Sequence, residues 1–182
     1  MPLEETMDKA QLEQCIHEYG KDVYTFCSQI TGNCQEADDL YQDTFLKATE
    51  LKEGIDYNRN PRSYFISVAL RIWKNRRRKF AWRKRIAGTC TLTEEAAEVN
   101  MPEQEISAED VVLQKELEQQ VRKAVGELAE KYRIPVYLYY TLQLSVEEIA
   151  NVLEIPQGTV KSRLHKARAL LRQELEVIFD EI

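Results

Sequence analysis

Hydrophobic residues recur at three- and four-residue steps along most of the chain, which is the spacing of one face of an α-helix. This pattern predicts a first helix from about Glu4 to Thr31, and Thr31-Gly32-Asn33 supplies residue types that end helices. It predicts a second helix from about Gln35 to Leu51 and a third from Pro61 or Ser63 to Ile86. These three segments together predict one small helical domain.

Helical spacing resumes in the last third of the chain. It predicts one helix from Ala108 or Glu109 to Lys131 and a second over Pro135–Gln143. Ser145 and Glu148 form an S-x-x-E capping box, in which each residue satisfies a backbone N–H at the start of a further helix. These segments predict a second helical domain.

Pro156 ends that short helix, because proline cannot continue the hydrogen-bond ladder. A last helix is predicted from about Gln157 to at least Leu171. With Val160 at zero and about 100° per residue, its inward stripe consists of Leu164, Ala167 and Leu171. The opposite face carries small, polar and basic residues, namely Lys161, Ser162, His165, Lys166 and Ala169.

Two helices joined by a short turn, with polar and basic side chains on the second, match a helix-turn-helix motif. The second helix of that motif enters the major groove of DNA. Lysine can neutralise phosphates or reach guanine, and serine can bond to several base edges. The alternative is an ordinary amphipathic hairpin with a solvated basic face.

Charge is segregated along the chain. The net charge of the 182 residues is −6, which argues against a general nucleic-acid coat protein. Residues 88–108 have weak periodicity, and Gly88 to Ile106 holds five Glu and no base. We therefore expect an all-α protein with two small helical domains, residues 1–87 and 109–182, joined by a flexible acidic linker over residues 88–108.

The third predicted helix is the basic part of the chain. Nine Lys or Arg and no acid lie among the 15 residues from Arg71 to Arg85, with Trp73, Phe80 and Trp82 interleaved. Cations follow phosphates, and exposed aromatic rings stack on unpaired bases. The mixture favours binding of melted DNA, with a merely solvated basic helix as the alternative.

Several classes of protein are not expected from this sequence. No run approaches the roughly 20 apolar residues of a membrane span, and the N-terminus lacks the pattern of a signal peptide, so we expect a cytoplasmic protein without membrane insertion. Neither the four cysteines nor the two histidines have zinc-site spacing. With no glycine-rich nucleotide loop or nucleophile–base pair either, we expect no metal, no cofactor and no catalytic residue.

The segment EIANVLEIPQGTVKSRLHKARALLR resembles region 4 of the sigma-70 family of RNA polymerase sigma factors, in its extracytoplasmic-function group. The run G-T-V-K-S-R-L-x-[RK]-A-R is a specific signature of that group. The resemblance implies that this helix reads the −35 promoter element. Contacts with bases or phosphates are implied for Lys161, Ser162, His165 and Lys166. Contacts with the DNA backbone are implied for Thr159 and Arg163.

The stretch D-D-L-Y-Q-D-T-F is similar to sigma region 2, whose acidic helix docks on the clamp of core RNA polymerase. This implies polymerase contacts for Asp39, Gln42, Asp43 and Leu46. The basic helix then corresponds to the segment that contacts the −10 element and its melted strand, through Arg71, Trp73, Lys74, Asn75, Arg77 and Arg78. The resemblance also implies that the segment Lys52–Arg62 includes the loop that captures a flipped base of the −10 element in this group.

The resemblance implies a sigma factor with core RNA polymerase and promoter DNA as partners, and often an anti-sigma factor as an inhibitor. Such a protein directs polymerase to promoters and helps to open the strands, and it is not an enzyme. Two other classes remain open. A transcriptional activator would bind duplex sites without polymerase, and an enzyme or nucleic-acid chaperone would bind strands without promoter output.

Overall fold

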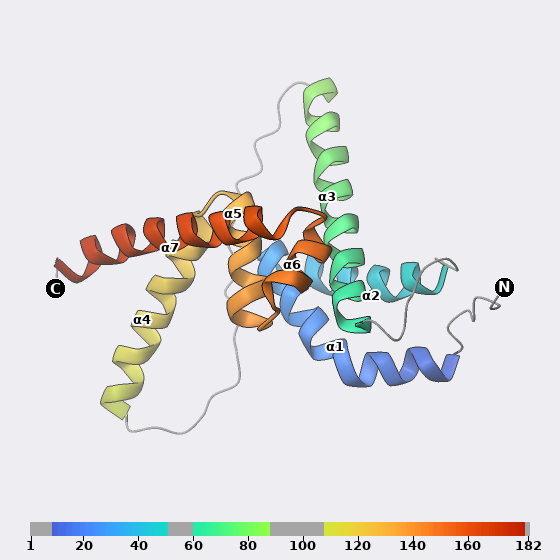
Figure 1. Ribbon diagram of the computed structural model, residues 1–182, viewed down its shortest axis with the longest axis horizontal. Helices are drawn as coiled ribbons and strands as arrows, with labels where there is room; N and C mark the ends of the chain where they lie inside the picture. The colour runs from blue at the N-terminus through green and yellow to red at the C-terminus, as the bar shows by residue number, and fades with distance from the viewer. Residues whose placement is uncertain (1–8, 51–59, 88–107, 181–182) are drawn as a thin grey trace. The chain divides into compact units, whose positions relative to one another are not determined.

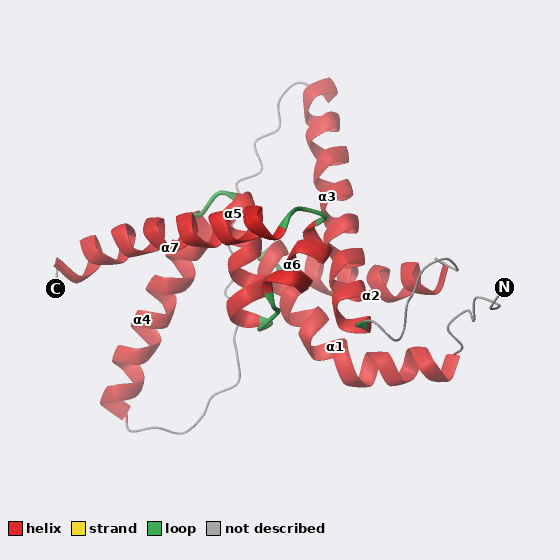
Figure 2. Ribbon diagram, viewed as in Figure 1, coloured by secondary structure: helices red, strands yellow, loops and turns green. Residues whose placement is uncertain are grey.

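The computed structural model describes residues 9–50, 60–87 and 108–180. Every regular element in these ranges is a helix (Figure 2). The chain divides into two compact units, residues 1–99 and 100–182. The predicted all-α class with two helical units is confirmed. The predicted acidic linker lies outside the described residues, as does most of the predicted loop after residue 51.

The first unit consists of α1 (Lys9–Thr31), α2 (Cys34–Glu50) and α3 (Pro61–Ala87), and each helix packs against the other two (Figure 1). Its core is aromatic and aliphatic, and Phe26, Leu40 and Phe65 are fully buried. Thr44 is also buried, and its hydroxyl donates to the Leu40 carbonyl at 2.6 Å. The buried polar group is therefore satisfied within its own helix.

Short polar residues set the helix boundaries of this unit. Gly32 has a φ of +67°, a conformation that favours glycine, and its N–H donates to the Ser28 carbonyl at 3.0 Å to end α1. The Asn33 side chain then accepts the Glu36 N–H at 3.1 Å and caps α2. The sequence Thr31-Gly32-Asn33 thus ends one helix, as predicted, and also begins the next.

The second unit holds α4 (Ala108–Glu127), α5 (Glu130–Val136), a π-helical turn η1 (Tyr137–Thr141), α6 (Val146–Leu153) and α7 (Gln157–Asp180). Helix α7 packs against α4, α5 and α6. The buried residues Leu138, Leu142, Ile149 and Val160 form its core. The stripe predicted from Val160 is thus turned toward the other helices.

The helix predicted to reach Lys131 was extended too far, because α4 ends at Glu127. Ala129 there has φ −54° and ψ 142°, an extended conformation that breaks the helix. The Arg133 guanidinium donates to the Gly126 carbonyl at 2.7 Å and covers the exposed end of α4. The break itself is at Ala129, which is neither proline nor glycine, although Gly126 stands in the last turn of α4.

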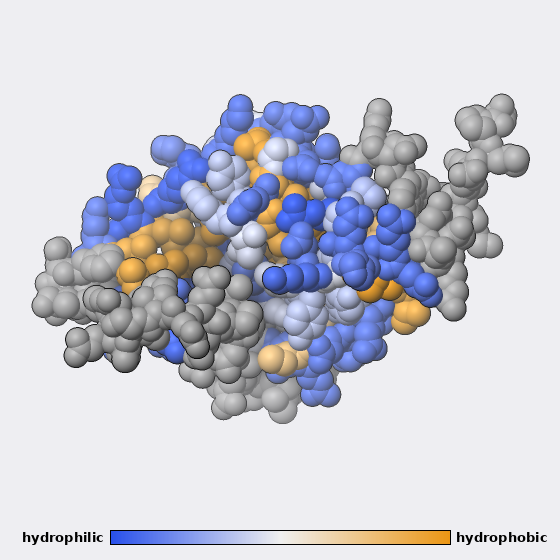
Figure 3. All heavy atoms as spheres, turned by 90° about the horizontal axis from the view of Figure 1, so that it is seen from below, coloured by the Kyte–Doolittle hydropathy of each residue, from blue (hydrophilic) through white to orange (hydrophobic). Residues whose placement is uncertain are grey.

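The segment predicted as a helix over Pro135–Gln143 is helical but not uniform. Pro135 lies inside α5 and is buried, and η1 follows with a bond from the Leu142 N–H to the Tyr137 carbonyl at 3.1 Å. Such i→i+5 bonds widen the helix locally. On the face shown in Figure 3, hydrophobic side chains form several groups among hydrophilic ones, and the group at the left of the view is extended.

Candidate nucleic-acid and polymerase interfaces

The connection between α6 and α7 has the geometry of a helix-turn-helix. Ser145 caps α6, where its hydroxyl accepts the Glu148 N–H at 3.2 Å and its N–H donates to the Glu148 carboxylate at 2.7 Å. The predicted capping box is therefore confirmed. At the other end Glu154 is left-handed, with φ 55° and ψ 44°. The Ile155 N–H donates to the Ala150 carbonyl at 3.1 Å, which completes a Schellman turn without glycine.

Pro156 is placed at the start of α7 rather than within a helix. Its carbonyl accepts the N–H groups of Thr159 at 2.9 Å and Val160 at 3.2 Å. Proline is tolerated at this position, because the N–H that it lacks would have no partner inside the helix. The three residues between α6 and α7 thus change the direction of the chain and fix the orientation of α7 against α6.

The outer face of α7 is the face predicted from sequence. The side chains of Lys161, Ser162, His165 and Lys166 are exposed, whereas Thr159 and Arg163 are partly buried at its edges. On the opposite side, Val160, Leu164 and Ala167 are buried. The Ser162 hydroxyl donates to the Thr159 carbonyl at 2.9 Å, so its oxygen lone pairs are left to accept from a partner.

Arg168 lies beside this face and is held by two tyrosines of η1. Its Nε donates to the Tyr140 hydroxyl at 2.7 Å, and its guanidinium lies 5.7 Å and 5.8 Å from the ring centroids of Tyr139 and Tyr140. Tyr140 is about half exposed. Cation–π contact and the hydrogen bond together restrict a side chain that would otherwise sample many rotamers.

The basic helix α3 changes character along its length. Its first half is part of the core, with Ile66 and Ala69 fully buried, and its second half, residues 77–85, is exposed. Figure 1 shows this second half extending past α1 and α2. Four of the predicted basic contacts, Arg71, Lys74, Arg77 and Arg78, are exposed, as is Asn75, which accepts a hydrogen bond from Arg78 at 2.8 Å.

Trp73 corrects the expectation of an exposed ring. Only 6% of its surface is accessible, because its position on α3 faces the helices that pack against it. Arg77 covers the ring with its guanidinium carbon 4.9 Å from the centroid. Trp73 is therefore a core residue that supports Arg77, whereas Phe80 and Trp82 are 55% and 63% exposed.

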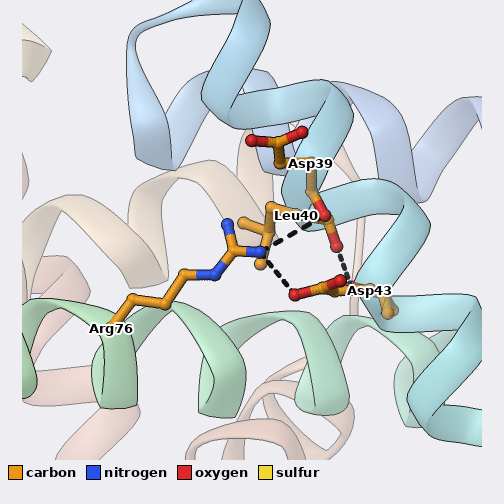
Figure 4. A network of polar contacts seen from close by, with 5 residues as sticks. Asp39, Leu40, Asp43 and Arg76 are labelled. Carbon is orange, nitrogen blue, oxygen red and sulfur yellow. Dashed lines mark hydrogen bonds and ion pairs between the residues drawn. The ribbon is translucent and has the colours of Figure 1, made fainter.

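Helix α2 presents the predicted acidic face. Asp39, Gln42, Asp43 and Leu46 are all exposed, and Leu46 has 63% of its surface accessible, high for an aliphatic residue. Asp43 is already engaged within the unit, since its carboxylate accepts from Arg76 of α3 at 2.5 Å (Figure 4). The same guanidinium nitrogen donates to the Asp39 carbonyl at 3.4 Å, which leaves the Asp39 carboxylate outside this contact.

Sequence reasoning missed Arg76 and Arg168. Both lie in basic segments that were recognised, but their roles come from Asp43 and Tyr140, which lie 33 and 28 residues away. Because each arginine lies so far from its partner in the sequence, no local sequence pattern indicates either contact. The only indication of the Asp43–Arg76 contact in the sequence was that one small domain holds an acidic helix and a basic helix.

The part of the chain that the structure describes contains no group of three metal-ligand residues and no helix long and apolar enough to span a membrane. Among the described cysteines, Cys15 and Cys27 are buried and Cys34 is exposed. Burial raises the pKa of the Cys27 thiol from 9.0 to about 12. Cys27 is therefore a neutral core thiol over the physiological range.

Two regions of one protein family match separate parts of this chain. Residues 15–83 match Sigma-70 region 2, and residues 118–171 match Sigma-70, region 4. The first match spans most of α1, all of α2 and most of α3, and the second spans the helix-turn-helix. Each unit described above therefore has its own family counterpart.

Curated relatives extend over nearly the whole chain. The ECF RNA polymerase sigma factor SigW of Bacillus subtilis is 31% identical over 175 residues, covering 92% of this chain and 90% of SigW. The ECF RNA polymerase sigma factor SigL of Mycobacterium tuberculosis is 28% identical over 170 residues, covering 93% and 91%. Both regions and the segment between them are therefore shared in the same order.

Solved structures show the same fold. The sigma factor RpoE, in complex with the anti-sigma factor NepR from Bartonella quintana, superposes with a TM-score of 0.73 at 21% identity, covering 91% of this chain and 96% of that chain. CnrH, in complex with the cytosolic domain of CnrY, gives a TM-score of 0.66 at 19% identity and covers 93% and 90%.

Proposed function

The chain belongs to the extracytoplasmic-function group of the sigma-70 family of RNA polymerase sigma factors, and from this membership we propose how its two helical units divide the work of initiation. As a sigma factor it binds core RNA polymerase, directs it to promoters and promotes strand opening. The observation that carries the division of roles is the separation of an outward basic face on α7 from a basic helix and an acidic helix in the other unit.

The outer face of α7 is assigned to the −35 element. Lys161 and Lys166 are exposed cations suited to phosphates or to guanine acceptors, and His165 lies between them on the same face. Ser162 would accept from a base amino group, because its own hydrogen is donated to Thr159. The partly buried Thr159 and Arg163 are assigned to the DNA backbone at the edges of the groove.

Helix α3 is assigned to the −10 element and the opening of its strands. Arg71, Lys74, Asn75, Arg77 and Arg78 are the proposed contacts. Their cations would neutralise phosphates, and neutralisation of several phosphates makes binding steeply dependent on salt. Trp73 is withdrawn from this set, because a buried ring cannot stack on a base.

The acidic face of α2 is assigned to core RNA polymerase. Asp39 and Gln42 offer exposed polar groups, and Leu46 offers an exposed apolar side chain beside them. A small apolar centre with charged neighbours is typical of a specific protein interface. Asp43 would act both in this interface and in the contact with Arg76.

The proposed division of the chain is residues 1–87 for core binding and the −10 element, residues 88–108 as an acidic linker, and residues 109–182 for the −35 element. An anti-sigma protein is proposed as a second partner, since RpoE and CnrH were both solved in complexes with partner proteins, NepR being named as an anti-sigma factor. The protein would act in the cytoplasm, where polymerase works, without catalysing covalent chemistry itself.

Transcription in vitro tests the proposal. Genomic fragments and purified core polymerase are incubated with and without this protein, and transcript 5′ ends are mapped. Specific starts that depend on the protein are expected, with shared sequences near −35 and −10. Tight binding of the protein alone to duplex sites, with no starts, would instead identify a transcriptional activator.

A further inference from the structure

Arg168 of α7 and Tyr140 of η1 form an exposed polar site beside the outer face of α7. The Arg168 Nε donates to the Tyr140 hydroxyl at 2.7 Å, and the guanidinium also lies near the rings of Tyr139 and Tyr140. These two rings meet edge to face, with their centroids 5.0 Å apart. Arg168 is exposed, and Tyr140 has 52% of its surface accessible. We propose that Arg168 and Tyr140 together bind one phosphate of promoter DNA at an edge of the −35 element.

The positive charge of Arg168 is not balanced by an acid in the part of the chain that the structure describes. Its guanidinium there contacts only the two tyrosines, whose phenol groups are not carboxylates. Residues 155–173 hold five Lys or Arg and no acid, so α7 offers no carboxylate within one turn of Arg168. The site therefore has the charge to attract an anion from a partner.

The contact between the two side chains leaves donors for that anion. A guanidinium has five N–H donors in a planar fork, and the Tyr140 hydroxyl accepts only the one on Nε. The Nη groups can bind two oxygens of a phosphate. Because the hydroxyl accepts from Arg168, its own hydrogen is available to donate, and it has no acceptor among the described residues. Arg168 and Tyr140 can therefore donate to the same phosphate.

The position of Arg168 on α7 favours DNA over an acidic protein as the partner. At about 100° per residue, Arg168, Lys161 and Arg172 lie about 70–110° to one side of the middle of the buried stripe. Arg163 and Lys166 lie about 70–130° to the other side. A helix in the major groove has a phosphate backbone along each of its two edges. Arg168 thus lies on one of the two edges that would meet a DNA strand.

The tyrosines would also reduce the cost of binding. A free arginine side chain samples many rotamers, and holding it in one of them before binding means that less side-chain entropy is lost in the complex. Tyr139 acts only in this way, as a positioning residue, whereas Tyr140 would also touch the phosphate. The inference rests on the proposed role of the outer face of α7 at the −35 element and adds two contacts to it.

Four holoenzymes test the proposal, assembled from core polymerase and full-length wild-type, Arg168→Ala, Arg168→Lys or Tyr140→Phe protein. Their affinity for a promoter identified by mapped starts is measured over a range of salt concentrations. Arg168→Ala should lower the affinity about tenfold, as expected for a hydrogen bond to a charged group, and reduce the salt slope by about 1. Arg168→Lys should keep the slope but lose part of the affinity, because lysine cannot reproduce the fork. Tyr140→Phe should lower the affinity about threefold without changing the slope.

A scan of individual phosphates identifies the partner. Promoter fragments carry one neutral methylphosphonate at a time across the −35 element. Wild-type holoenzyme should lose affinity at a phosphate where Arg168→Ala loses none, because that contact is already absent in the variant. Lys131→Ala is the matched control, since it removes an exposed lysine that lies 4.9 Å from the ring of Tyr132 on α5. This control should give the wild-type scan.

Two results would overturn the proposal. One is an Arg168→Ala scan that matches the wild-type scan at every phosphate. The other is a loss of core polymerase affinity in Arg168→Ala, which would identify an acidic protein surface as the partner. If no methylphosphonate across the −35 element affects even the wild-type protein, the assignment of the outer face of α7 to DNA fails, which is a separate result.

Discussion

Asp43 of α2 accepts a hydrogen bond from Arg76 of α3 at 2.5 Å, and the same nitrogen reaches the Asp39 carbonyl at 3.4 Å (Figure 4). The contact joins the proposed polymerase-binding helix to the proposed DNA-binding helix. Both side chains are partly exposed, 40% for Arg76 and 52% for Asp43, so the pair contributes little to stability. Its effect is to orient a carboxylate that also belongs to the acidic face.

This geometry predicts different outcomes for the two aspartates. Asp39→Lys should weaken core polymerase binding about tenfold or more, because a like charge placed at an interface costs several kcal/mol. It should leave the unfolding temperature unchanged, since the Asp39 carboxylate takes no part in the contact with Arg76. Titration of labelled protein with core polymerase and thermal unfolding measure the two effects.

A charge swap separates the two roles of Asp43. Asp43→Arg combined with Arg76→Asp should restore the ion pair, and stability should differ from wild type by less than about 1 kcal/mol. Polymerase affinity should stay low, because the carboxylate has moved from α2 to α3. Full recovery of affinity in the double variant would show that Asp43 acts only through Arg76.

The outer face of α7 can be tested with single cations. Lys161→Ala and Lys166→Ala should each lower use of the −35 element and reduce the slope of log binding constant against log salt by about 1, the contribution of one phosphate contact. Core affinity should not change. Lys123→Ala, an exposed lysine of α4, is the matched control. Promoter use unchanged in both α7 variants would remove this face from the DNA interface.

Glu154 predicts a stability effect of the helix-turn-helix. Its φ of 55° is unfavourable for residues with a Cβ, and Glu154→Gly should raise the unfolding free energy by about 0.5–1 kcal/mol. Glu154→Val should lower it, because a β-branched residue tolerates this conformation least. Thermal unfolding, monitored by circular dichroism, measures the order of stability of the wild type and the two variants. A valine variant as stable as the glycine variant would contradict the left-handed turn.

The two cysteines that flank the α1–α2 turn, Cys27 and Cys34, should differ in reactivity. Cys34 is exposed and should be alkylated in the native protein, whereas Cys27 should react only on global unfolding. Mass spectrometry after a timed iodoacetamide pulse distinguishes them, in a Cys90→Ser background. Rapid labelling of Cys27 at neutral pH would contradict its burial.

The raised pKa of Cys27 also gives a pH dependence of stability. The unfolded thiol loses its proton near pH 9.0 and the folded one near pH 12, so the unfolded state carries fewer protons between these values. Stability contributed by the neutral thiol is complete below pH 9 and is lost as the pH rises toward 12. Urea unfolding at pH 8 and pH 10.5 should show the decline, and Cys27→Ala should make it smaller.

Features that depend on neighbours in sequence could be predicted without the structure. The capping box of Ser145 and Glu148 spans three residues, and Gly32 ends a helix through its own backbone freedom. The inward and outward faces of α7 follow from helical periodicity alone. These local rules were sufficient for the all-α class and for the proposed DNA-binding face.

Other features were decided by contacts between distant parts of the chain. Trp73 and Trp82 have the same chemistry and similar basic neighbours, yet one is 6% and the other 63% exposed, because α1 and α2 cover only the first half of α3. The partners of Arg76 and Arg168 lie on other elements. The sequence by itself determined the helices and their faces through local hydrogen bonding and periodicity. Only the tertiary structure decided which rings are buried and which charges are paired, because packing ends where the neighbouring helices end.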